Sequence, residues 1–328
     1  MFLYTWIFRG AQEEKVKEHP RFLFAPMEGI TYAAFRSLHH ELFPGADEYF
    51  TPFIAPDREG SFKTKYLKEL TAGVPSVPQL LVNSAEAFNV TALKLFALGF
   101  REINLNTGCP SGTVYAKHKG AGMLRDLDTL DRILDAVFEQ AERIGFRVSV
   151  KTRMGDHSTA EFPEILEVFN RYPLSRLIVH ARCRDDWYQG TPDMQGFRNA
   201  AESCLCPIVY NGNIASSNDL DRLLSASSVD AVMIGRGAVR NPALFRELSG
   251  GSPLSADELQ VFLDRLTAQW LADGLGPAFT MERMKALWFY MQDLFPDGKK
   301  QIKTLLKAKT LDEYCAAVSS LLRSSPLQ

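Results

Sequence analysis

One cysteine of this sequence stands where an α/β protein places its chemistry. Cys109 lies between Gly108 and Pro110, just after the short apolar run 103–105. An apolar run that ends in a polar loop containing Gly and Pro is a typical position for functional residues. The proline restricts the backbone, so the sulfur has a defined direction. An isolated free cysteine is more often a small buried residue, and the rest of the chain must decide between these two interpretations.

Polar residues also follow other short apolar runs. Each has an ordinary explanation alone: a solvated strand end, a core histidine or a simple turn. Polar groups at six consecutive strand ends are hard to explain by packing, so we expect an active face there. In chain order they are Gln79, Asn106, Cys109, Lys151, Arg153, His180, Arg182, the segment Asn211-Gly212-Asn213 and the segment Gly235-Arg236-Gly237.

The runs themselves predict the fold. They are short, nearly all apolar, and alternate with helical patterns, which is typical of a parallel sheet covered on both faces. Eight such units predict a closed (β/α)8 TIM barrel, an α/β fold. A doubly wound sheet is the rival, but no G-x-G-x-x-G follows the first run. The predicted strands are 21–25, 49–53, 78–82, 102–106, 147–151, 177–180, 207–210 and 231–235.

The strand pattern stops after about residue 251, and only helical patterns follow. Gly250-Gly251-Ser252-Pro253 is the natural linker. We therefore predict an N-terminal extension over 1–20, a catalytic barrel over 21–250 and a small all-helical domain over 254–328.

Composition sets further limits. Hydrophobic residues make up 46% and charged residues 23%, which is ordinary for a globular protein. Five cysteines without a framework spacing indicate a reducing, cytoplasmic setting. Cys204-x-Cys206 is too sparse for a zinc site, so we expect no metal. We also expect no membrane-spanning segment and no obligate protein partner.

The loops after the last two strands suit a phosphate group. In TIM barrels this is the usual phosphate site. Gly212, Gly235 and Gly237 allow backbone N–H groups to approach an anion, and Arg236 adds a charge-assisted contact. Lys151 lies at a different strand end, where a cation suits a ligand that becomes anionic, as a reduced flavin does.

The motifs, taken in order, resemble those of the tRNA-dihydrouridine synthases. The resemblance covers the barrel almost from end to end. The matching segments are APMEGIT at 25–31, PQLL at 78–81, LNTGCPS at 105–111, KGAGML at 119–124, VKTRMG at 150–155, IVHAR at 178–182, YNGNI at 210–214 and VMIGRG at 232–237.

The resemblance implies an FMN enzyme that uses NADPH, or NADH, to reduce a specific uridine of tRNA to 5,6-dihydrouridine. Hydride would pass from the reduced flavin to C6 of the uracil, and Cys109 would donate a proton to C5. The residues implied around FMN are Pro26, Met27, Glu28, Gln79, Lys151, His180, Asn211, Gly212, Asn213, Gly235 and Arg236. Those implied near the substrate are Asn106, Arg153 and Arg182.

Basic residues near the C-terminus indicate a second contact with RNA. Between residues 281 and 310 there are seven Lys or Arg and three Asp or Glu, a net +4 in a chain of net −2. A solvated helix face is the alternative interpretation. The functional interpretation is a phosphate-backbone patch that includes Lys299, Lys300 and Lys303, which Lys117 and Lys119 extend toward Cys109.

Two other functions stay open at this stage. Dihydroorotate dehydrogenase is another FMN barrel with a similar cysteine loop, but a small substrate does not need the helical tail. A non-catalytic RNA-binding module on a degenerate barrel is the second, and the presence of both Cys109 and the glycine loops disfavours it.

Overall fold

Nine parallel strands form a single sheet in the order β3-β2-β1-β9-β8-β7-β6-β5-β4. The computed structural model describes residues 19–57, 61, 65–71 and 73–327, so most of the predicted extension over 1–20 lies outside the described residues. The strands are β1 (Arg21–Phe24), β2 (Glu48–Phe50), β3 (Ser76–Val77), β4 (Gln79–Leu80), β5 (Glu102–Thr107), β6 (Arg147–Arg153), β7 (Leu177–His180), β8 (Ile208–Asn211) and β9 (Ala231–Ile234).

Pro78 divides the third predicted strand into β3 and β4. Proline has no N–H to donate to a ladder, so pairing is interrupted at this residue. On one side β3 pairs with β2, and on the other β4 pairs with β5. The sheet therefore closes on itself through two pieces that are adjacent in the chain. Counted as one strand, they complete eight, and the predicted (β/α)8 barrel is confirmed.

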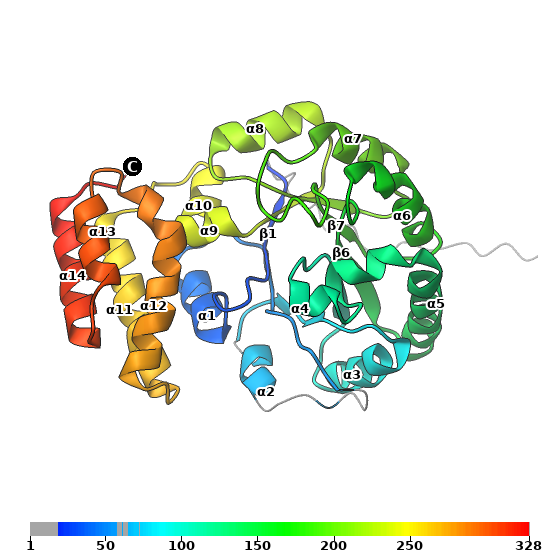
Figure 1. Cartoon of the computed structure of the whole chain (residues 1–328), viewed down its shortest axis with the longest axis horizontal. Coiled ribbons are helices and arrows are strands. Elements are labelled where there is room, and N and C mark those ends of the chain that lie inside the picture. The colour runs from blue at the N-terminus through cyan, green and yellow to red at the C-terminus, as the bar shows by residue number, and fades with distance from the viewer. Residues whose placement is uncertain (1–18, 58–60, 62–64, 72, 328) are drawn as a thin grey trace, which may run out of the picture.

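Helices cover the outside of the barrel (Figure 1). The longest of these, α5, is capped at its start by Asp126, whose carboxylate accepts from the Thr129 N–H, and at its end by Gly145 with φ 89°. Among the described residues, no helix is long and apolar enough to cross a membrane. These helices are α1 (Ala33–Leu42), α2 (Lys65–Leu70), α3 (Ala85–Ala97), α4 (Gly112–Tyr115), α5 (Leu127–Ile144), α6 (Phe162–Phe169), α7 (Met194–Ser203), α8 (Ser217–Ala226), α9 (Arg236–Arg240) and α10 (Leu244–Leu248).

The barrel interior changes character along the strands. Side chains alternate between the two faces of each strand, so every second residue points inward. Deeper in the barrel than the carboxyl ends of the strands, the interior is a small apolar cluster that includes Leu23, Phe50, Ile178 and Val209. Toward the carboxyl ends of the strands, the residues that point inward become polar. The register places Asn106 beside Lys151, Arg153 beside His180, and His180 beside Asn211.

The remaining chain forms a helical lobe beside the barrel (Figure 1). Its first helix packs against α1, where Phe262 meets the rings of Phe35 and Phe43 at 5.3 and 5.5 Å between centroids. Arg265 adds a bidentate ion pair with Glu41 at 2.6 and 2.8 Å. The lobe is therefore docked on the barrel rather than joined by the linker alone. Its helices are α11 (Ala256–Ala272), α12 (Pro277–Met291), α13 (Lys299–Leu306) and α14 (Leu311–Ser324).

Phe262→Ala is expected to lower the free energy of unfolding by about 3–5 kcal/mol, because it removes a fully buried ring between lobe and barrel and leaves a cavity. Urea unfolding followed by circular dichroism measures this. Phe279→Ala is the matched control, since Phe279 is 75% exposed on α12 and its loss creates no cavity. Equal effects of the two substitutions would contradict the assigned contact.

Candidate active site

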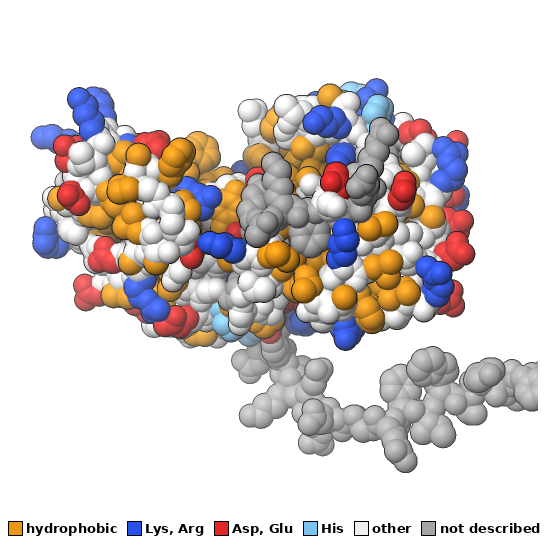
Figure 2. Space-filling model, turned by 90° about the horizontal axis from the view of Figure 1, so that it is seen from below, with side chains coloured by type: hydrophobic (Ala, Val, Ile, Leu, Met, Phe, Trp, Pro, Cys, Tyr) orange, Lys and Arg blue, Asp and Glu red, His pale blue; other side chains and the backbone are white. Residues whose placement is uncertain are grey.

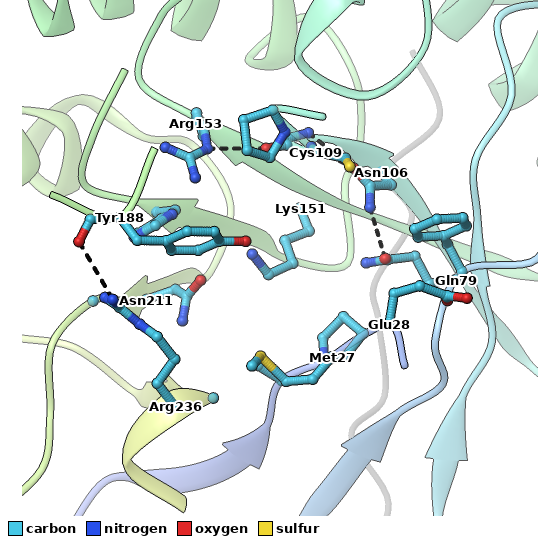
Figure 3. A pocket seen from close by; sticks show the side chains of 18 residues that line it. Met27, Glu28, Gln79, Asn106, Cys109, Lys151, Arg153, Tyr188, Asn211 and Arg236 are labelled. Carbon is cyan, nitrogen blue, oxygen red and sulfur yellow. Dashed lines mark hydrogen bonds between the residues drawn. The ribbon is translucent and has the colours of Figure 1, made fainter. Parts of the chain in front are cut away.

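A pocket opens at the carboxyl ends of the strands, and most of the predicted site residues line it (Figure 3). They come from seven of the strands or the loops that follow them, because the inward-facing residue at each strand end points toward the barrel axis. The predicted residues that line the pocket are Pro26, Met27, Glu28, Gln79, Asn106, Cys109, Lys151, Arg153, His180, Asn211, Gly212, Gly235 and Arg236.

A turn built on Asn106 positions Cys109. The Asn106 Oδ1 accepts from the backbone N–H groups of Gly108 and Cys109, at 3.0 and 2.9 Å. On the far side, the Ala121 N–H donates to the Cys109 carbonyl at 3.0 Å. Only glycine at position 120 allows this close approach, because a Cβ there would lie 2.8 Å from both the Cβ and the carbonyl oxygen of Cys109. The loop is held from both sides.

Buried amides link this turn to the barrel interior. Since the Asn106 oxygen faces the loop, its Nδ2 faces inward and donates to Gln79 Oε1 at 2.8 Å. Gln79 Nε2 then donates to Asn104 Oδ1 at 2.8 Å, and Asn104 Nδ2 to Ser149 Oγ at 2.9 Å. Each amide nitrogen keeps a second N–H beyond these bonds. The orientation of every amide in this series follows from the loop.

Arg153 connects three loops through backbone carbonyls. Its guanidinium donates to the carbonyls of Gly108 at 3.0 Å, Cys183 at 2.8 Å and Trp187 at 2.7 Å. The side chain is 1% exposed. Arg153 therefore fixes the Cys109 loop relative to the loop after β7, and it also stacks over Tyr188 at 5.3 Å from the ring centroid.

The electrostatics of the pocket are dominated by cations. Burial, and next the nearby Arg153, lower the pKa of Lys151 to about 7. In the described part of the chain, Lys151 makes no ion pair. Burial raises the pKa of Cys109, with a smaller opposing effect from the Ser111 backbone and the two cations. The sulfur is therefore a thiol at neutral pH and can serve as an acid.

His180 is a neutral ring beside these cations. Arg182 Nη1 lies 3.1 Å from His180 Nε2. A guanidinium can only donate, so Nε2 accepts and the ring proton is on Nδ1. Burial, followed by the charge of Arg153, holds the pKa of His180 well below its usual value. Arg182 also donates to the carbonyls of Gln189 and Gly190, so it links His180 to the loop after β7.

The end of the pocket opposite Cys109 is lined by Arg236, Gly212 and Gly235 (Figure 3). The Arg236 Nη2 donates to Asn213 Oδ1 at 2.6 Å, and its guanidinium stacks over Tyr188 at 4.9 Å from the centroid. A Cβ on Gly235 would lie 3.1 Å from Met27 Sδ, so a larger residue would crowd this part of the pocket. A cation beside such a close backbone approach suits an anionic group.

Comparison with known proteins places the chain in a family. The model of the dihydrouridine synthase (Dus) family matches residues 23–274. The chain belongs to the dihydrouridine synthase family. It is 27% identical over 304 residues to a tRNA-dihydrouridine(16) synthase of Shewanella oneidensis, which covers 89% of this chain and 95% of that protein. A tRNA-dihydrouridine synthase B of the same organism is 28% identical over 316 residues, covering 89% and 94%.

Solved structures agree with the fold. A GH18 chitinase from Pseudoalteromonas aurantia superposes with a TM-score of 0.50 at 10% identity and covers 70% of this chain and 99% of that chain. At this identity the likeness concerns the barrel alone.

Some predicted residues of this family member lie outside the pocket. Asn213 and Arg182 stand behind its wall, bonded to Arg236 and His180. Lys117 is exposed and Lys119 is half-buried on the loop after α4. The lysines of α13 lie at the far end of the helical lobe and are exposed (Figure 1). Their predicted roles toward RNA stay predictions, as does that of Arg153 toward the uracil.

Sequence reasoning missed two aromatic residues of the pocket. Phe53 follows β2, and Tyr188 comes from the long loop after β7. Tyr188 lies between the guanidinium groups of Arg153 and Arg236 and is 49% exposed. The adjacent aromatics Trp187 and Tyr188 in a polar loop after a strand end were the available signal.

Lys151→Met is expected to stabilise the ligand-free protein at neutral pH. The folded pKa of about 7 lies below the unfolded value of about 10.4, so between them the unfolded state binds more protons and wild-type stability rises with pH. The advantage of the variant is therefore full below about pH 7 and fades toward about pH 10. Denaturant unfolding across this range measures it, with exposed Lys94→Met as control. A pH-independent difference would contradict the assignment.

Proposed function

We propose that this protein reduces a uridine of tRNA to 5,6-dihydrouridine in this pocket, with FMN as cofactor and NADPH or NADH as reductant. The observation that carries the proposal is the Cys109 loop, which is hydrogen-bonded from both sides at a pocket lined by Lys151, Arg153 and Arg236. The family match over residues 23–274 and the names of the relatives support this activity over oxidation of dihydroorotate. Five free cysteines fit the reducing cytoplasm, where tRNA is found.

The residues of the pocket suit FMN. Lys151 is a half-buried amine without an ion pair in the described residues, and an anionic ligand would satisfy it. Arg236 with Gly212 and Gly235 would hold the phosphate group, while Met27, beside Gly235, would pack on the ring system. The others that would contact the cofactor are Pro26, Glu28, Gln79, His180 and Asn211, while Asn213 would act by holding Arg236. When bound, FMN would supply the hydride that C6 of the uracil accepts.

Cys109 would supply the proton. Addition of a hydride to C6 leaves negative charge at C5, conjugated with the C4 carbonyl, and C5 then needs an acid. The raised pKa of Cys109 keeps a proton on the sulfur at neutral pH, and the Asn106 turn fixes where that proton is offered. Asn106, Arg153 and Arg182 would orient the base, directly or by holding the loops around it.

Contacts with the phosphate backbone supply much of the affinity of a protein for RNA. We therefore expect the tRNA to contact basic residues outside the pocket as well. Lys299, Lys300 and Lys303 are exposed on α13 and would bind phosphates there, with Lys117 and Lys119 nearer to Cys109. The helical lobe would then be the part that holds tRNA while the barrel performs the reduction.

Cys109→Ala is expected to slow dihydrouridine formation by about 10²- to 10⁴-fold, the usual effect of losing a positioned acid. Binding of FMN and tRNA and the bleaching of FMN by NADPH should change little, because the sulfur takes no part in them. Single-turnover measurements with unmodified tRNA separate these quantities. Cys315→Ala, on α14, is the control. Normal formation of dihydrouridine in Cys109→Ala would rule out this cysteine as the acid.

Replacing Lys299, Lys300 and Lys303 together with Gln is expected to weaken tRNA binding and to flatten the slope of log affinity against log salt by roughly one per lost contact. Filter binding at several salt concentrations measures both. Gln at the exposed Lys68 and Lys94 is the control. An unaltered slope in the triple variant would mean that these lysines form only a solvated helix face.

A further inference from the structure

Two adjacent aromatic residues lie at the end of α12, Phe289 exposed and Tyr290 half-buried. Phe289 is 72% exposed and meets Tyr290 at 5.1 Å between ring centroids, with the planes at 86°. We call this pair the aromatic ledge. A single exposed aromatic ring needs no explanation. Its position next to the active face gives this pair a different meaning.

Contacts on α12 fix the ledge relative to the pocket. The helix packs on α9, which begins at the pocket residue Arg236. The short helix η3 (Gln292–Leu294), which directly follows α12, also contacts α9, so the ledge lies at the end of α12 that is close to α9. Burial and then Tyr188 raise the pKa of Tyr290, and Arg236 opposes this. Earlier on α12, Arg283 stacks over Tyr32 at 4.5 Å from the ring centroid.

The loop after β7 adds two more exposed aromatic residues to this face of the barrel. Trp187 and Tyr188 are 45% and 49% exposed on the loop after β7, and Trp187 has φ 51°, a backbone conformation that non-glycine residues rarely adopt. Figure 2 shows a hollow between the helical lobe and the barrel at the upper edge of the view. An RNA strand that enters the pocket would pass rings of both the loop after β7 and α12.

We propose that the aromatic ledge stacks the base of a nucleotide adjacent to the target uridine. The inference rests on the proposed function. A base that is to be reduced must leave its stack, and its neighbour then loses a stacking partner. Exposed aromatic rings replace that partner in proteins that bind unpaired nucleotides, whatever the base. The ledge would thereby stabilise the unstacked neighbour while the uridine occupies the pocket.

The test compares three variants of the full-length protein. Phe289→Ala removes the exposed ring. Phe279→Ala is the matched control, because Phe279 is 75% exposed on the same helix but lies ten residues earlier, about 15 Å along the axis. Phe289→Tyr restores a ring that can stack. Filter binding with unmodified tRNA at one salt concentration gives Kd, and dihydrouridine is measured in the same tRNA.

Phe289→Ala is expected to weaken tRNA binding roughly 5- to 150-fold, the range for one base on one aromatic side chain. Phe279→Ala should bind as wild type, and Phe289→Tyr should recover most of the affinity. The salt slope of Phe289→Ala should equal that of wild type, because stacking releases no counterions. Bleaching of FMN by NADPH should also be unchanged.

Three outcomes would overturn the ledge as a base-stacking site. In the first, Phe289→Ala and Phe279→Ala bind tRNA equally well. In the second, tRNA binding is unchanged but sedimentation of the free Phe289→Ala protein shifts to smaller species, so that the ledge joins copies of this chain. In the third, Phe289→Tyr fails to restore binding. Wild-type protein that forms no dihydrouridine would instead refute the proposed function, so the two failures are distinguishable.

Discussion

The side-chain amide of Asn106 is the contact on which the Cys109 loop depends. Its oxygen accepts two backbone N–H groups of the loop, and its nitrogen must therefore face the barrel interior, where Gln79 receives it. An aspartate would keep an oxygen that accepts both N–H groups but would place its second, negatively charged oxygen against the Gln79 oxygen. An apolar residue would leave two N–H groups unsatisfied, each with a desolvation penalty of about 1–3 kcal/mol. Only an amide meets both demands.

This arrangement gives the strands two functions along their length. The inward residues of the lower barrel, such as Leu23 and Phe50, form an apolar layer that stabilises closure. Nearer the pocket, the inward residues include the amides Gln79, Asn104 and Asn106, and a buried polar series is tolerated only when its members are hydrogen-bonded. Asn104 and Ser149 complete the series at its lower end. The apolar layer thus supports a polar layer that is specified by hydrogen bonding rather than by volume.

The sequence could predict those features that depend on period and spacing. Alternating strands and helices implied the barrel, and the two-residue period of the strands implied that Lys151 and His180 would share its interior. The role of Arg153 toward carbonyls was not predictable, because its partner Trp187 is 34 residues away in a loop whose conformation has no periodic pattern. The break at Pro78 could have been expected, since proline cannot donate to either neighbouring strand.

Electrostatics connect ligand binding to the proton on Cys109. The ammonium form of Lys151 lowers the pKa of Cys109, while burial raises it more strongly, so the thiol is neutral at neutral pH. The pKa of Lys151 is about 7, so the amine is only partly protonated at that pH. An anionic ligand beside Lys151 would favour protonation of the amine and compensate its charge. The negative charge of that ligand would also disfavour the thiolate, so the thiol would keep its proton. A ligand that fills the cationic part of the pocket would thereby keep the acid protonated without any movement of the chain.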